Sequence, residues 1–121
     1  MACGDDGVVK KMESEVMALH DEVMPRMMDS QKLRKSLKNV ADSLESLPAP
    51  DSTRIGEITA IVADMKTAEQ GMMDWMRDYD PKKATGDKKE AMEYLDQQMK
   101  QIKQVKLDIE GGIERANTLI K

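Results

Sequence analysis

Apolar residues recur every three or four positions along three segments of the chain, and this spacing places their side chains on one face of an α-helix. In the last segment, for example, Leu95, Met99, Ile102, Val105 and Ile109 follow one another at these intervals. An apolar face of this kind is normally buried against other helices. The pattern therefore predicts three long helices, at about residues 7–46, 52–79 and 87–120.

Helix-breaking residues separate the three segments. The stretch LPAPD, Leu47–Asp51, supplies two prolines after the first segment and an aspartate that can cap the second helix. The stretch DYDPKKATGD, Asp78–Asp87, ends the second helix before Pro81, and Asp87 with Glu90 resembles a capping box for the third. Short connections force successive helices to run antiparallel. We therefore expect an all-α fold, an antiparallel up-down-up three-helix bundle with coiled-coil-like packing.

Two features interrupt this helical pattern. Pro25 lies inside the first helix, where it removes one backbone hydrogen bond and leaves the carbonyl of Asp21 without its helical partner. We expect the first helix to be kinked or briefly broken near Pro25. Gly111 and Gly112 each cost about 1 kcal/mol relative to alanine inside a helix. Because the apolar spacing continues beyond them to Ile120, we expect the third helix to continue as well.

Composition supports one helical domain and excludes some partners. The 121 residues include two tyrosines, one tryptophan and no phenylalanine, and 35% of them are charged, a balance typical of long amphipathic helices. No apolar run approaches the roughly 18 residues that would cross a bilayer, and no signal-peptide pattern is present. The net charge of −4 would repel phosphate backbones, so we expect no nucleic-acid partner.

Methionine takes the place of phenylalanine, and most of the 12 methionines are predicted to gather at one end of the bundle. In antiparallel helices each residue can be assigned a level by counting away from the connections. This places the only histidine, His20, at the level of residues near 78. The predicted Met-rich end comprises Met17, His20, Met24, Met27, Met28, Met72, Met73, Trp75, Met76, Tyr79, Met92 and Tyr94.

Three hypotheses account for the Met-rich end. The first, which we favour, is packing, because methionine is flexible and fills irregular gaps in a core. The second is a soft-metal site, since monovalent copper selects thioethers and imidazole, and Trp75 could close such a site through a cation–π contact. Its ligands would be His20, Met17, Met24 and Met76. The third is a groove for a hydrophobic ligand or protein partner, lined by His20, Met17, Met24, Met72, Met76 and Trp75.

Catalytic patterns do not occur in the sequence. There is no Gly-rich phosphate loop, no nucleophile elbow, no HExxH motif and no pair of Glu-x-x-His motifs. Cys3, the only cysteine, has no base beside it. Glu69 lies on the main apolar face of the second helix, where a buried carboxylate needs a partner. We therefore expect a protein that is not an enzyme and uses no cofactor.

Two stretches, HDEVMPRM (His20–Met27) and MMDWMRDYDP (Met72–Pro81), resemble small bacterial envelope lipoproteins of unknown function, often labelled "viral A-type inclusion protein". The resemblance covers most of the chain. It implies a helical lipoprotein whose mature form starts at a lipidated cysteine, and ACGDDG (Ala2–Gly7) is similar to such a start. The family brings no catalytic residues. The sequence is then expected to begin near the mature terminus.

Together these observations predict a non-enzymatic envelope lipoprotein module with an interaction or structural role. Residues 1–6 would form a flexible tether, Cys3 would carry the lipid that is its only contact with the membrane, and its partner would be another protein or a second copy. The alternative function is a periplasmic binder of soft metal (copper) or of a small hydrophobic ligand through the Met-rich end. The alternative location is the cytoplasm, with Cys3 unmodified.

Overall fold

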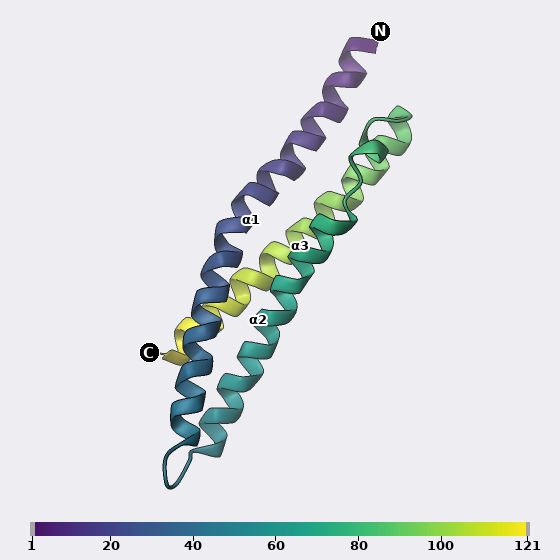
Figure 1. Ribbon diagram of the computed structural model, residues 1–121. Helices are drawn as coiled ribbons and strands as arrows, with labels where there is room; N and C mark the ends of the chain where they lie inside the picture. Colours follow the sequence, from purple (N-terminus) through teal and green to yellow (C-terminus); the bar gives the residue numbers. More distant parts are fainter. Residues whose placement is uncertain (1, 121) are drawn as a thin grey trace.

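The chain folds into three long helices and one short 3-10 helix. In chain order they are α1 (Ala2–Glu45), α2 (Ser52–Asp78), η1 (Pro81–Ala84) and α3 (Lys88–Ile120). The computed structural model describes the backbone of residues 2–120 and the side chains of residues 7–120, and this part of the chain contains no strand. Successive long helices run antiparallel beside one another, and each packs against both others (Figure 1). The predicted three-helix bundle is confirmed.

The longest helix, α1, begins at Ala2 and ends at Glu45. Its start therefore precedes the predicted one at residue 7, and the side chains of residues 2–6, including the candidate lipid attachment site Cys3, lie outside the described residues. At Pro25 the helix continues without interruption, and Figure 1 shows a gentle bend along it. The expected short break is absent. Val23 and Met27 are both buried, at 0% and 4% exposure, so packing on either side of Pro25 holds the helix together.

The predicted caps hold the connections between the helices. The carboxylate of Asp51 accepts from the backbone N–H of Arg54 at 3.0 Å, and that of Asp87 accepts from Glu90 N–H at 3.3 Å. These bonds satisfy backbone donors that have no partner within the helix itself. After α2, the backbone N–H of Asp80 donates to the hydroxyl of Tyr94 at 2.7 Å. The second connection is therefore fastened to α3.

The core follows the apolar faces read from the sequence. Its larger fully buried side chains come from all three helices, namely Val16, Val23, Leu37, Ile58, Met65, Met72, Leu95, Ile102 and Ile109. Burying each one contributes about 1.5–3 kcal/mol relative to leaving it in water. Methionine is not confined to this core, because Met17, Met28 and Met73 are 38%, 53% and 50% exposed. Packing thus accounts for some methionines and not for others.

The two adjacent glycines of α3 have different surroundings, and α3 continues through both of them, as predicted. A Cβ atom on Gly112 would lie 3.1 Å from Cγ of Met65 on α2, whereas a Cβ on Gly111 would meet nothing within 4 Å. Such a contact at Gly112 is tight. Gly112 therefore permits close packing of α3 on α2, and Gly111 does not serve this purpose.

We expect Gly111→Ala to raise the free energy of unfolding by up to about 1 kcal/mol, because alanine is the better helix former and the site has room. Gly112→Ala should give no increase, since the gain in helix propensity is offset by displacing the fully buried Met65. Urea denaturation of the two variants beside the parent protein measures the difference. Equal stabilisation by both substitutions would show that Gly112 is not needed for the packing of α2.

Candidate functional site

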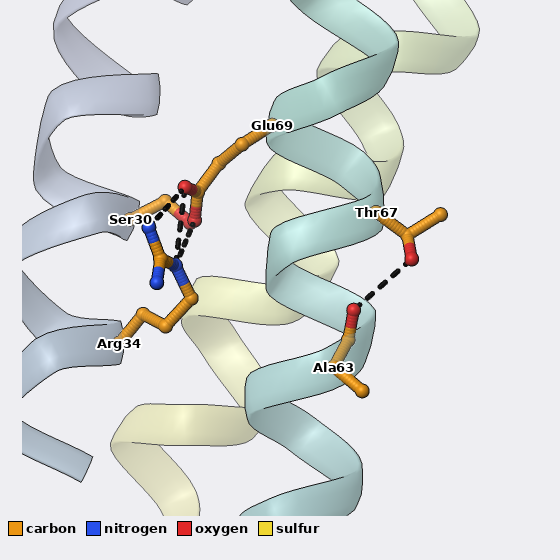
Figure 2. Close-up of polar contacts among 5 residues, drawn as sticks. All are labelled: Ser30, Arg34, Ala63, Thr67 and Glu69. Atoms are coloured by element: carbon orange, nitrogen blue, oxygen red, sulfur yellow. Dashed lines mark hydrogen bonds and ion pairs between the residues drawn. The ribbon is translucent and has the colours of Figure 1, made fainter. Parts of the chain in front are cut away.

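A buried polar cluster joins α1 to α2 and fixes their register (Figure 2). The hydroxyl of Ser30 donates to Oε2 of Glu69 at 2.8 Å. The guanidinium of Arg34 donates to both carboxylate oxygens, from Nη2 to Oε1 at 3.0 Å and from Nε to Oε2 at 3.1 Å. Figure 2 shows the two α1 side chains pointing at the carboxylate from the same helix. The partner expected for Glu69 is therefore present.

The charged and polar groups of this cluster are paired with one another, so the cluster is structural rather than reactive. Ser30 is fully buried, Glu69 is 5% exposed and the side chain of Arg34 is 18% exposed. A buried charge is tolerated when it is paired and its lone pairs are occupied by hydrogen bonds, and both oxygens of Glu69 meet this condition. We interpret the cluster as a structural one, which sets which residues of α1 and α2 face each other.

From this register, the positions of residues in the Met-rich end follow. Met76 lies seven residues after Glu69 along α2, and in an antiparallel pair this corresponds to seven residues before Ser30 along α1. Met76 is thus level with Val23, one residue from Met24. Both Met24 and Met76 are half-buried. The expectation that the two helices bring these thioethers to one end is consistent with this register.

A row of aromatic rings crosses the Met-rich end from α1 through α2 to α3. The ring centroids are 6.1 Å apart for His20 and Trp75, 5.1 Å for Trp75 and Tyr79, and 5.9 Å for Tyr79 and Tyr94. The Nζ atom of Lys83 lies 5.6 Å from the centroid of the last ring. Trp75 is only 6% exposed. The spacings are those of favourable aromatic pairs.

Two polar atoms in this row have no hydrogen-bond partner among the described residues, although both are buried: Nε1 of Trp75 and the hydroxyl of Tyr79. Burial raises the pKa of Tyr79 above its ordinary value, and the charge of Glu13 and the neighbouring Tyr94 raise it further. A buried donor without a partner costs about 1–3 kcal/mol. The row is therefore held by packing more than by hydrogen bonds.

Removing the Tyr79 hydroxyl should accordingly not lower the stability of the fold. We expect Tyr79→Phe to leave the free energy of unfolding unchanged or to raise it, because the lost group makes no hydrogen bond. The matched variant Tyr94→Phe should lower it by about 1 kcal/mol, because the backbone N–H of Asp80 loses its acceptor. Denaturation in urea at neutral pH compares the two. A larger loss for Tyr79→Phe than for Tyr94→Phe would contradict this account.

His20 has the geometry of an oriented imidazole. Its Nδ1 lies 3.1 Å from Oδ1 of Asp21, and its side chain is 23% exposed. Met17 and Met24 lie three residues before it and four residues after it, so both are its neighbours on one face of α1. Met72 is fully buried at 0% exposure and belongs to the core. Among the described residues, no three His, Cys, Asp or Glu side chains form a group that could hold a metal ion.

A groove that the sequence analysis did not predict runs along α2 and α3. Two adjoining hollows of about 390 and 550 Å³ share Arg115 and lie between residues 54–71 of α2 and residues 107–119 of α3. We call them together the α2–α3 groove. Gly71 and Gly111 line it without side chains, and Leu107, 63% exposed, lies at its edge. The groove follows α2 for about 25 Å, at about 1.5 Å per residue.

Charge along the α2–α3 groove is predominantly acidic. Its two arginines are already engaged, because Arg54 donates to the carbonyl of Leu119 at 2.7 Å and Arg115 lies 3.6 Å from the carboxylate of Asp64. The acidic side chains that line it outnumber these arginines and are Glu57, Asp64, Asp108 and Glu114. The groove therefore presents apolar surface with a negative border.

Sequence reasoning missed this groove because it followed only the main apolar faces. The sequence nevertheless contained two signals. Leu107 falls outside the apolar spacing of the third helix, and Gly71 and Gly111 lie inside helices although glycine is a poor helix former. Only the packing of α2 on α3 shows that these residues lie together.

Comparison with protein-family models, with curated proteins and with solved structures gives no match to this chain. Within its described part, no helix is long and apolar enough to cross a membrane.

Proposed function

We propose that this protein is a non-enzymatic helical interaction module whose α2–α3 groove binds an amphipathic helix of a partner protein. The observation that carries this proposal is the groove itself, which is long, partly apolar and lined by two glycines. Amphipathic helices commonly bind in such grooves by inserting apolar side chains spaced three or four residues apart. A segment of about 17 residues would match its length of about 25 Å.

The charge of the groove border determines which kind of helix the groove favours. The acidic border of the groove favours a helix whose apolar stripe is flanked by lysine or arginine, and it disfavours one flanked by glutamate. The same border disfavours a second copy of this chain, which carries a net charge of −4. The partner we propose is therefore a protein segment with a basic amphipathic helix.

A synthetic peptide tests this proposal. An 18-residue peptide of leucine and lysine in helical spacing should bind the protein, and its leucine–glutamate counterpart should not, as measured by fluorescence anisotropy of the labelled peptides. Binding should weaken as salt is added, because exposed charges are screened. Leu107→Ser removes the apolar edge of the groove and Gly111→Leu fills it, so each should reduce affinity at least about tenfold.

Met28→Ser is the matched control, because Met28 is 53% exposed on α1, away from the groove. It should bind the leucine–lysine peptide as the parent does. Equal binding of both peptides, or equal loss in the control and the groove variants, would contradict the proposal. A dimer of the parent chain in light scattering that Gly111→Leu abolishes would assign the groove to a second copy instead.

We also propose that the module is held at the cell envelope by a lipid on Cys3. This rests on the resemblance of His20–Met27, Met72–Pro81 and the stretch ACGDDG around Cys3 to envelope lipoproteins. Labelling bacterial cells with a fatty-acid analogue should mark the protein, expressed with a lipoprotein signal peptide, and Cys3→Ser should lose the label. Labelling that survives Cys3→Ser, or no labelling of the parent, would place the protein elsewhere.

A further inference from the structure

On the face of α1 that carries His20, one methionine precedes the imidazole and another follows it by about one turn. Met17 and Met24 lie on the adjacent turns, and helical side chains lean towards the N-terminus of their helix. Met24 therefore leans towards His20, and His20 leans towards Met17. The exposed fraction is 38% for Met17 and 23% for the side chain of His20, so this side of the cluster is open to solvent.

The helix α2 supplies a fourth side chain and an aromatic ring. By the register that the Ser30–Glu69 hydrogen bond sets, Met76 is level with Val23, within one turn of both His20 and Met24. The ring of Trp75 lies 6.1 Å from the imidazole, centroid to centroid, and is tilted by 34°. Thioethers from two helices and an aromatic ring therefore lie within about one turn of the level of the imidazole.

Asp21 orients this imidazole. Its Oδ1 lies 3.1 Å from Nδ1 of His20. In the tautomer that donates Nδ1–H to this carboxylate, Nε2 keeps a lone pair for a metal ion. A carboxylate that accepts from one ring nitrogen while the other binds metal is the usual support of a ligating histidine. The pair of adjacent residues thus prepares Nε2 as a ligand.

We propose that Nε2 of His20, together with the thioethers of Met17, Met24 and Met76, binds one monovalent copper ion beside the ring of Trp75. Neutral, polarisable sulfur ligands with an imidazole select a soft monovalent cation over hard divalent ions, which require carboxylates and carbonyls. The aromatic face adds a cation–π attraction when it lies within about 6 Å of the cation. This site lies on the α1–α2 side and does not depend on the α2–α3 groove.

Titration with monovalent copper under anaerobic, reducing conditions tests the site. The background is Cys3→Ser, because a thiolate would bind the same ion. With a chromogenic chelator as competitor, one equivalent of copper should bind, and the fluorescence of Trp75, the only tryptophan, should be quenched in proportion. His20→Gln should lower affinity at least about tenfold and abolish the quenching.

Substitution of methionine by leucine removes the sulfur and keeps the apolar volume, so it separates binding from folding. Met24→Leu, Met17→Leu and Met76→Leu should each weaken copper binding, while the controls Met28→Leu and Met73→Leu should not. No copper-dependent quenching in the parent background, or affinity that His20→Gln leaves unchanged, would overturn the proposal. Equal weakening in the two control variants would overturn it too.

The two proposed sites can be tested independently of each other. His20→Gln and Met24→Leu should bind the leucine–lysine peptide as the parent does, and Gly111→Leu should bind copper as the parent does. If a variant loses copper binding but still binds the leucine–lysine peptide, the proposed function is therefore not affected. Loss of the peptide response alone would leave the copper site standing.

Discussion

Arg34→Met is expected to lower the free energy of unfolding by about 3 kcal/mol, because it leaves the buried carboxylate of Glu69 without its cation. Glu69 is 5% exposed and accepts hydrogen bonds from Arg34 on both oxygens. After the substitution only the hydroxyl of Ser30 still donates to it. Thermal and urea denaturation monitored by circular dichroism measure the loss.

The double variant Arg34→Met/Glu69→Met should recover most of this stability, since a buried ion pair replaced by apolar side chains of similar size is often neutral. The double-mutant cycle then gives a large coupling energy. Lys38→Met is the matched control, because Lys38 pairs with Asp42 at 3.4 Å on the surface and both side chains are more than half exposed. It should change stability by less than about 1 kcal/mol. If Lys38→Met lowers the free energy of unfolding as much as Arg34→Met does, burial of the charge is not what makes the loss of Arg34 costly.

Met72→Ala is expected to cost about 2–5 kcal/mol, whereas its neighbour Met73→Ala should cost less than about 0.5 kcal/mol. Met72 is fully buried, and its truncation leaves a cavity that the surrounding helices cannot fill completely. Met73 is 50% exposed and loses little contact. Urea denaturation of the two variants measures both values.

Met72→Leu distinguishes volume from sulfur. Because leucine conserves most of the volume, we expect a cost below about 1.5 kcal/mol. That result would confirm that Met72 serves packing, in contrast to the sulfur atoms proposed to bind copper. If Met72→Leu costs as much as Met72→Ala, methionine at this position has a role beyond filling space.

The three helices and most of their buried residues could be predicted from the amino-acid pattern alone. Periodicity located them because a helix needs one apolar face, and Asp51 and Asp87 marked two starts because free backbone donors need acceptors. It also identified Glu69 as a residue that needs a partner. These properties depend on neighbours within a few positions along the chain, which a sequence displays directly.

The way in which the helices meet depends on contacts between residues far apart in the chain. Pro25 was predicted to kink or break α1; the break is absent, and the helix continues with a gentle bend because packing on both sides of the proline compensates for one missing hydrogen bond (Figure 1). Arg34 and Ser30 could not be named as partners of Glu69, since periodicity gives the face of a helix but not its register against another. The α2–α3 groove and the tight contact of Gly112 with Met65 arise from the separation of two helices, which depends on side chains more than 30 residues apart in the chain.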